Sequence, residues 1–317
     1  MDPSPTELDA FRCKLCGSRR LRRSHRLRRA DGTPFWGGTC SNCGLFQVAY
    51  DWGAAPPLRP AVVWEHAMAY SEDDLEPSRR KAARFAQTLA ATGPVSGARV
   101  LEVGCGRGFL LKALLEGGAS HAVGLEYHGG DVTYARGVLG LEDVRTVGFE
   151  DQGTWPDAEF DAVVSLDVLE HVHDLRSFFE QLVRVTRPGG IWLHATPGSD
   201  AVTHRLGRAL IRGGAPAVGQ QLCATISYPT QLAEPGPHVQ FLGRRQLEWL
   251  QTQLPLELLW SRYESAYSFD DGHYARNLPL LRWLPHAVGR GLFGLARRVV
   301  RNKLVFAARI SGRAPPR

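Results

Sequence analysis

Long apolar segments are missing from this chain of 317 residues. A helix that crosses a membrane needs about 18 or more consecutive apolar residues, and no segment approaches that length. The first residues, Met-Asp-Pro-Ser-Pro, also lack the charged and apolar regions of a secretory signal peptide. From these absences we expect a cytoplasmic protein without a transmembrane segment.

Cysteines are few, and four of the six lie in two matched pairs. Cys13 and Cys16 form one C-x-x-C motif, Cys40 and Cys43 form another, and a glycine follows each pair. Four thiolates brought together in this way form the closed tetrahedral site of structural zinc, so the spacing predicts an N-terminal zinc ribbon. The alternatives are two disulfides, which need an oxidising compartment, and a redox pair, which needs a βαβ setting.

Basic residues outnumber acidic ones at both ends of the chain. Residues 281–317 contain nine lysines and arginines and no acid, whereas the middle of the chain is acidic. Between the cysteine pairs, the arginine-rich segment 19–29 alternates in a way that predicts one arm of a β-hairpin. Basic ends of this kind suit nucleic acid, anionic lipid or an acidic partner. A solvated surface is favoured over a nucleic-acid contact, because no aromatic residues interleave with the arginines.

The length suits one large domain with a small module. We expect the zinc ribbon over 1–55, a proline-rich linker with helices that can form a lid over 56–98, and an α/β domain over 99–317 with a Gly/Pro-rich insertion at 197–240. Apolar patterns predict strands over 122–125, 143–147, 160–166, 191–196, 256–261 and 303–310, and helices over 78–89, 175–185 and 244–254, with a turn at 187–190.

A glycine-rich turn lies at the centre of the sequence. The apolar run 100–103 is typical of a buried strand, Gly104, Gly106 and Gly108 follow it, and a helical pattern begins at Phe109. Glycine permits positive φ and lets a ligand lie against the main chain. The N-terminus of the helix then points its free N–H groups at that ligand.

Two acids accompany this turn. Glu102 comes just before the glycines, and Glu126 ends the next strand, where a carboxylate can accept hydrogen bonds from ribose hydroxyls. The glycine spacing is shorter than that of most dinucleotide sites, and an acid near the turn suits a ligand with a cationic amino-acid end. A turn that binds a nicotinamide dinucleotide, or binds nothing, is the alternative.

This combination resembles motif I of the class I S-adenosylmethionine-dependent methyltransferases, and the likeness covers about residues 99–262. The resemblance implies a Rossmann-like seven-stranded methyltransferase sheet. It also implies S-adenosyl-L-methionine as cofactor, with Gly104 and Gly106 under its methionine part and Glu126 on its ribose. Glu102 would support the loop or the amino group of the cofactor.

The resemblance also implies an adenine contact after the third strand. Relatives often have aspartate where this chain has Phe149, so the contact is open between Phe149, Glu150 and Asp151. Ser165 and Leu166 end the fourth strand, and we expect them to border the ligand because ligands bind at the carboxyl ends of such strands.

Two histidines are candidates for the base that removes a proton from the acceptor. His171 follows the fourth strand in a segment that resembles the ubiquinone-biosynthesis methyltransferases, and His238 follows the insertion. A neutral imidazole suits deprotonation of a hydroxyl, and we prefer His238. A capping role for Glu170 and His171, and a buried structural role for His238, are the alternatives. In some relatives acids at this point bind a divalent cation, which is an option for Asp167 and Glu170.

The favoured function is methylation of a small molecule, as an O-methyltransferase on a natural-product or sugar intermediate. The first alternative is an rRNA base methyltransferase that recognises RNA with its zinc ribbon. The acidic middle of the chain argues against it, since phosphate contacts should surround its pocket. The second alternative is a cofactor-binding scaffold without catalytic activity.

Overall fold

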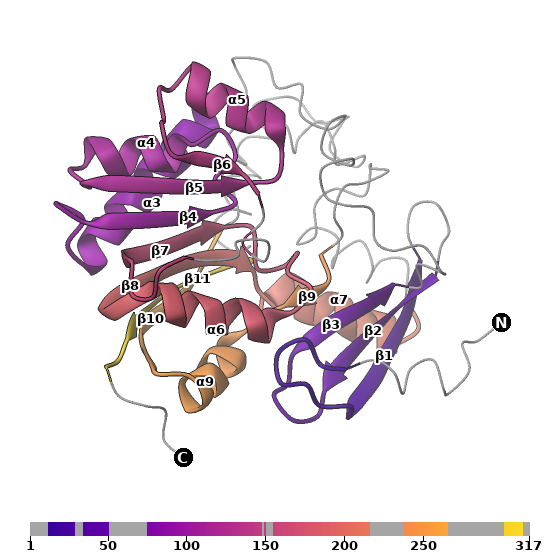
Figure 1. The fold of residues 1–317 in the computed structure, drawn as a ribbon. Coiled ribbons are helices and arrows are strands. Elements are labelled where there is room, and N and C mark those ends of the chain that lie inside the picture. The colour runs from indigo at the N-terminus through magenta and orange to yellow at the C-terminus, as the bar shows by residue number, and fades with distance from the viewer. Residues whose placement is uncertain are drawn as a thin grey trace, which may run out of the picture.

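The computed structural model describes residues 12–28, 34–50, 75–147, 149, 155–215, 238–265 and 301–312. These residues form a seven-stranded sheet and a four-stranded sheet that lie side by side (Figure 1). The larger sheet, with helices on both faces, confirms the predicted Rossmann-like α/β fold. Within the described part of the chain, no helix is both long and apolar enough to cross a membrane.

The large sheet has the strand order β10-β11-β8-β7-β4-β5-β6. Its strands are β4 (Arg99–Val103), β5 (His121–Glu126), β6 (Val144–Thr146), β7 (Phe160–Leu166), β8 (Thr186–Pro197), β10 (Leu256–Glu264) and β11 (Lys303–Ile310). Strands β4 to β8 pair in parallel, and β11 is antiparallel to both β8 and β10. The chain leaves β4 toward β5 on one side and later returns to β7 on the other. In open α/β sheets ligands bind where the strand order reverses in this way, at the carboxyl ends of the strands, here β4 and β7.

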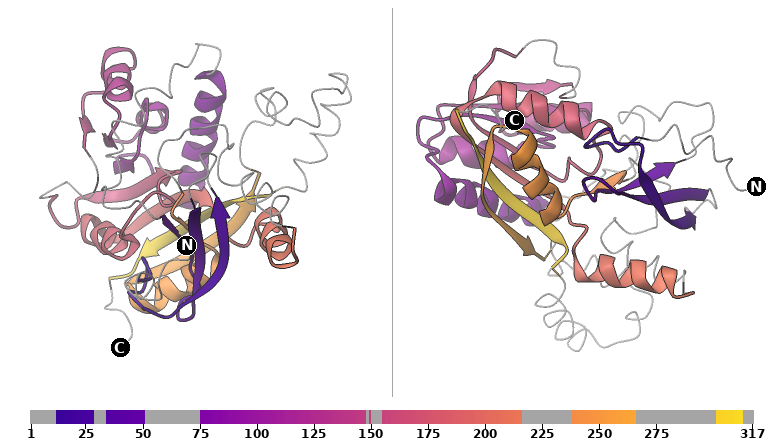
Figure 2. Two further views of the ribbon diagram at one scale, coloured as in Figure 1. Left: turned by 90° about the vertical axis from the view of Figure 1, so that its right-hand side faces the viewer. Right: turned by 90° about the horizontal axis from the view of Figure 1, so that it is seen from below.

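Helices cover both faces of this sheet, as the apolar character of its parallel strands requires. The helices are α3 (Leu75–Thr92), α4 (Phe109–Glu116), α5 (Gly129–Gly137), α6 (Leu175–Val185) and α9 (Arg244–Gln253). α3, α4 and α5 pack on one face and α6 and α9 on the other, which Figure 2 shows from below. In α3, Ala82, Phe85 and Leu89 form the buried stripe that the helical period predicts.

The four-stranded sheet combines two distant parts of the chain. Strands β1 (Leu21–Arg28), β2 (Pro34–Cys40) and β3 (Phe46–Tyr50) form an antiparallel meander, and β9 (Gln240–Phe241) adds the fourth strand beside β3. We call residues 12–28 and 34–50 the N-terminal module. Its β1–β2 pair confirms the predicted hairpin.

The structure adds to the expected elements at two places. β8 begins at Thr186 rather than after the predicted turn, because Thr186 pairs with Phe160 and the chain then bulges before Ile191 pairs with Ala162. The segment 197–240, expected as a Gly/Pro-rich insertion, contains the helix α7 (Val202–Arg212). The linker and the N-terminal part of the proposed lid, residues 56–74, lie outside the described residues.

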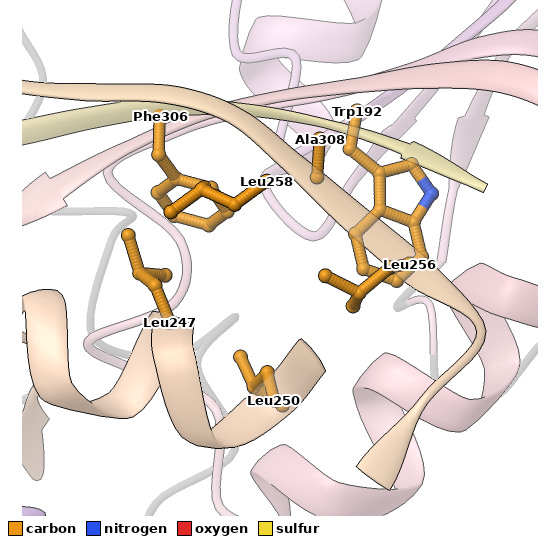
Figure 3. A pocket seen from close by; sticks show the side chains of 7 residues that line it. All are labelled: Trp192, Leu247, Leu250, Leu256, Leu258, Phe306 and Ala308. Atoms are coloured by element: carbon orange, nitrogen blue, oxygen red, sulfur yellow. The ribbon is translucent and has the colours of Figure 1, made fainter. Parts of the chain in front are cut away.

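A small pocket lies between α9 and the strands β8, β10 and β11 (Figure 3). Its lining consists of Trp192, Leu247, Leu250, Leu256, Leu258, Phe306 and Ala308. The indole N–H of Trp192 donates to Thr186 instead of facing this space. The pocket is therefore a gap in apolar packing, and it offers no group that could orient a polar ligand.

Candidate active site

The three glycines after β4 all have positive φ, but their surroundings differ. Their φ angles are 70°, 51° and 81° for Gly104, Gly106 and Gly108. A Cβ on Gly104 would lie 2.4 Å from Cγ2 of Val168, and one on Gly108 would lie 2.3 Å from Cδ1 of Leu141. A Cβ on Gly106 would have no atom within 4 Å. Gly106 therefore faces open space, where a ligand can lie against the backbone.

Glu126 ties this loop to the end of β5. Its Oε2 accepts a hydrogen bond from the N–H of Gly106 at 2.8 Å, and its Oε1 accepts one from the N–H of His128 at 2.9 Å. Burial raises the pKa of the carboxyl, and these backbone donors oppose the shift. Each carboxylate oxygen has a further lone pair, so Glu126 can also accept hydrogen bonds from a sugar diol.

Glu102 is a buried acid at the carboxyl end of β4. Its side chain is 2 % exposed, and Oε2 has no hydrogen-bond partner among the residues that the structure describes. Burial raises the pKa of Glu102 well above its usual value, and the positive charge of Lys81 partly opposes the shift. A buried carboxyl without a full set of partners is costly, and a cationic group of a ligand would satisfy it. The acid thus fits the amino group of S-adenosylmethionine.

Asp167, the first residue after β7, joins three elements. It adopts a φ of 58°, and its carboxylate contacts Lys81 of α3 at 3.0 Å and Lys303 of β11. Burial alone would raise the pKa of Asp167, but the ammonium groups of Lys303 and Lys81 outweigh burial and hold it well below its usual range. Asp167 is therefore ionised at neutral pH.

The two histidines named as candidate bases lie side by side. The ring centroids of His171 and His238 are 4.8 Å apart, with an angle of 73° between the rings. Nε2 of His238 lies 4.0 Å from Oε1 of Glu170, whose Oε2 accepts a hydrogen bond from Thr196. Burial lowers the pKa of His238 well below its usual value, and His171 lowers it further. His238 is therefore neutral at pH 7, and the burial that keeps it neutral also makes it a weak base.

Glu170 belongs to the same cluster. Burial raises its pKa to about 8, and the negative charge of Asp167 adds to the shift. One ligand atom from each of Glu170, His171 and His238 lies within 4.8 Å of the others. Two imidazoles and one carboxyl are a ligand set that suits a divalent cation once the acid is deprotonated. The cluster can thus serve either as a proton acceptor or as a cation site.

The four cysteine sulfurs form a second cluster, in the N-terminal module. Sγ of Cys13 lies 3.5 Å from Sγ of Cys43, and Cys16 and Cys40 have the same separation. All four sulfurs lie within 4.8 Å of one another. A tetrahedral zinc site with zinc–sulfur bonds of about 2.3 Å places its sulfurs roughly 3.8 Å apart. The observed spacing therefore fits zinc.

The remaining residues predicted to bind the cofactor are buried or partly buried, or lie outside the described residues. Ser165 is fully buried, and its Oγ lies 2.7 Å from Nδ1 of His194, while Leu166 is partly buried. Phe149 packs edge to face on a phenylalanine of α6, with ring centroids 5.0 Å apart. Glu150 and Asp151 lie outside the described residues, so the adenine contact stays a prediction.

Sequence reasoning missed the two lysines that contact Asp167. Lys303 stands at the start of the apolar run of β11, and Lys81 precedes the buried Ala82, so both positions offered a weak signal of a buried charge. Their meeting at one carboxylate depends on the pairing of β11 with β8 and on the packing of α3.

The sheet order, the glycine loop and its acids define a class I methyltransferase domain of the kind that uses S-adenosylmethionine. In agreement with this class, the family model described as "Methyltransferase domain" matches residues 75–259. The chain belongs to this family.

Curated relatives share the same region. A ubiquinone biosynthesis O-methyltransferase of Chelativorans sp. is 31% identical over 137 residues, which cover 41% of this chain and 49% of that protein. One from Xylella fastidiosa is 38% identical over 102 residues, covering 31% and 41%. The chain thus spans at most about half the length of these relatives. Among solved structures, the YcgJ protein of Bacillus subtilis has a TM-score of 0.48 at 15% identity, covering 73% of this chain and 99% of its own.

Proposed function

We propose that the protein transfers a methyl group from S-adenosylmethionine to a hydroxyl oxygen of a small molecule, with a natural-product or sugar intermediate as the substrate class. The observation that carries this proposal is the pair His171 and His238, which lies next to the glycine loop. Val168, in the turn before His171, is the residue that a Cβ on Gly104 would strike. The names of the two O-methyltransferase relatives support oxygen as the acceptor atom.

The chain has groups suited to the ribose and to the methionine part of the cofactor. Glu126 would accept hydrogen bonds from the ribose, Gly106 would leave room for the methionine part, and Glu102 would face its amino group. The space beside Gly104, also predicted to lie under the methionine part, is taken by Val168. When bound, the cofactor supplies an activated methyl group on a sulfonium. The protein then has to align the acceptor and remove its proton.

The histidine pair supplies the candidate groups for proton removal, and the negative charge of Asp167 favours the protonated form of His238. His238 is neutral at pH 7 because of its burial, and His171 contacts it edge to face. We propose His238 as the base, with His171 as the second candidate. The protonated Glu170, 4.0 Å from His238, would not compete for the proton at neutral pH.

We further propose that the four cysteines hold a structural zinc ion. Their sulfur spacing supports this assignment, and four protein ligands leave no open coordination position for chemistry. Metal analysis of the purified protein should find one zinc per chain. The variant Cys43→Ser should lose it, and Cys105→Ser, outside the cluster, should keep it.

Calorimetry with S-adenosylhomocysteine tests the cofactor. Replacing Glu126 by glutamine removes the charged acceptor, so the affinity should fall roughly 10- to 100-fold. Glu116→Gln, at the exposed end of α4, is the control and should bind as the wild type does.

The same experiment can refute the assignment. Tight binding of a nicotinamide dinucleotide, with no binding of S-adenosylhomocysteine, would contradict it. With labelled S-adenosylmethionine and a set of phenols, catechols and sugars, we expect label in a hydroxyl-bearing acceptor. Label found only in RNA, with salt-dependent binding, would favour an rRNA methyltransferase instead.

A further inference from the structure

A glutamine from another part of the chain makes two hydrogen bonds to the turn after β7. Gln240 is fully buried in β9, and its Nε2 donates to the carbonyl oxygens of Leu169 at 2.6 Å and Val172 at 2.5 Å. These two carbonyls lie on either side of Glu170 and His171. A single amide group therefore fixes both ends of the short segment that carries His171.

The same part of the chain carries the second histidine. His238 lies two residues before Gln240, and the N–H of Val239 between them donates to the carbonyl oxygen of Glu170 at 2.8 Å. Three hydrogen bonds therefore join this segment to the turn that carries His171, two from the side chain of Gln240 and one from the backbone. The imidazole rings of His171 and His238 make their edge-to-face contact beside these three hydrogen bonds.

The opposite edge of β9 is held by the N-terminal module. Gln240 pairs with Gln47 of β3, and the Gln47 side chain is itself buried. Its Oε1 accepts a hydrogen bond from the N–H of Lys14, and its Nε2 donates to the carbonyl oxygen of Arg12, both at 3.0 Å. The carbonyl oxygen of Lys14 in turn accepts a hydrogen bond from the N–H of Arg176 in α6. The module thus supports β9 and the segment that follows the turn.

We propose that Gln240 is a positioning residue that sets the placement of His171 and His238 relative to each other, with the N-terminal module as its support. This inference rests on the proposed function in that it assigns the histidine pair its chemical role. A base acts only within hydrogen-bond reach of the proton that it removes, and displacements of about 1 Å cost much of the rate. A glutamine is suited to this place because its amide has two N–H donors for two carbonyl groups.

The chain offers a matched control in Gln246. This residue is also buried at the boundary between the module and the large domain, where its Nε2 donates to the carbonyl oxygen of Cys43 at 2.8 Å. Its Oε1 accepts a hydrogen bond from the N–H of Gly243. Gln246 therefore makes bonds of the same kind as Gln240, but none of those bonds reaches the turn that carries His171.

The experiment compares Gln240→Leu with Gln246→Leu in the full-length protein. Side-chain ¹⁵N–¹H spectra of the histidines, assigned with His171→Gln and His238→Gln, report the tautomer and surroundings of each ring. Gln240→Leu should shift or broaden the signals of His171 and His238 and leave that of His121, on β5, unchanged. Gln246→Leu should leave all three signals unchanged. Both variants should bind S-adenosylhomocysteine within about twofold of the wild type.

Two results would overturn the inference. One is a Gln240→Leu protein whose His171 and His238 signals match those of the wild type. The other is an equal change in both variants, which would show that any damage to the boundary moves the histidines. If Gln240→Leu does not fold, Gln240→Glu keeps the shape of the side chain without its N–H donors, and the same outcomes apply. Failure of the wild type to bind S-adenosylhomocysteine would instead refute the proposed cofactor and leave the spectra as an independent test.

Discussion

The glycines of the loop after β4 share one backbone conformation but differ in what surrounds them. At Gly104 and Gly108 a methyl group would collide with Val168 and Leu141, so packing alone accounts for both glycines. At Gly106 a methyl group would meet only open space, so among the described residues only its positive φ favours glycine there. The same space would let a ligand lie against the backbone of Gly106.

This contrast leads to a prediction for Gly106→Ala. Positive φ costs a residue with a Cβ about 1–2 kcal/mol, and the new methyl group would point into the proposed cofactor site. We expect this loss in unfolding free energy together with a fall of about tenfold or more in affinity for S-adenosylhomocysteine. Urea unfolding and calorimetry measure the two effects.

Gly97 provides the control for this substitution. It has a φ of 75°, and a Cβ added to it would have no atom within 4 Å, but it precedes β4, at the opposite end of that strand from the loop. Gly97→Ala should lose similar stability and keep the wild-type affinity. Equal loss of affinity in both variants would mean that strain, rather than occupation of the ligand space, weakens binding.

Individual positions also show where reasoning from the sequence reaches its limit. Glu102 and Glu126 could be named because each stands at a fixed distance from the glycines, and both lie at the loop. Ser165 could also be named as a site candidate because it lies at the end of a strand. Its hydroxyl, however, makes a hydrogen bond with His194 of the neighbouring strand. Which neighbour a side chain contacts depends on the adjacent strand, β8, and no local pattern encodes that contact.

The longer elements were predictable for a physical reason. The bounds of β7, α6 and β11 agree with the prediction, because each has a clear apolar period and a clear end. α6, for example, begins at the capping side chain of Asp174, which accepts a hydrogen bond from Ser177. Strand β9 has only two residues and no period, so its pairing with β3 could not be predicted.

Asp167 connects α3, β7 and β11 through one carboxylate, and this gives the fold a defined pH dependence. The pKa of Asp167 is held below its usual value in the folded protein. The ionised group therefore contributes stability that is present above its unfolded pKa of about 3.9 and is lost as the pH falls toward the lower folded pKa. The substitution Asp167→Asn is suitable because asparagine tolerates positive φ.

We expect Asp167→Asn to lower the unfolding free energy by about 2–3 kcal/mol at pH 7, since it leaves the buried Lys303 and the partly buried Lys81 without their anion. The difference from the wild type should shrink as the pH falls below about 4. Urea unfolding between about pH 3 and pH 7 checks both statements. Asp157→Asn, which removes an exposed pair with Arg184, should cost at most about 1 kcal/mol. A difference that stays constant over the whole pH range would contradict the role given to Asp167.

The N-terminal module and the large domain share one apolar core. Leu15 and Leu45 belong to the same buried cluster as Leu242 and Leu247. Hydrogen bonds also connect each cysteine pair with the large domain. The N–H of Arg176 donates to the carbonyl oxygen of Lys14, and Nε2 of Gln246 donates to the carbonyl oxygen of Cys43. The sequence predicted a domain boundary at the proline-rich linker and gave no indication of this shared core, because residues far apart in the chain form it.

This arrangement predicts how loss of the metal would spread through the protein. Four thiolates without zinc repel one another or take up protons, so the two cysteine pairs should loosen. Two segments make hydrogen bonds to the cysteine pairs or their neighbours. Residues 167–176 do so through Lys14, and residues 238–253 do so through Cys43 and through the pairing of β9 with β3. After treatment with a chelator, amide hydrogen exchange should accelerate in these segments. Exchange in residues 99–116 should stay slow, and the affinity for S-adenosylhomocysteine should change little, because β4, the glycine loop and α4 have their own packing.

Addition of zinc to the treated protein should restore slow exchange, which separates loss of the metal from irreversible damage. Uniform acceleration over the chain would mean that the metal supports the fold as a whole. Unchanged exchange would mean that the module keeps its place without it. Suppose that exchange accelerates only at the turn of His171 and at His238, and that cofactor binding stays intact. Binding of the methyl donor and proton removal from the acceptor would then depend on different parts of the chain. The glycine loop would then bind the methyl donor independently, while the N-terminal module would maintain the groups that act on the acceptor.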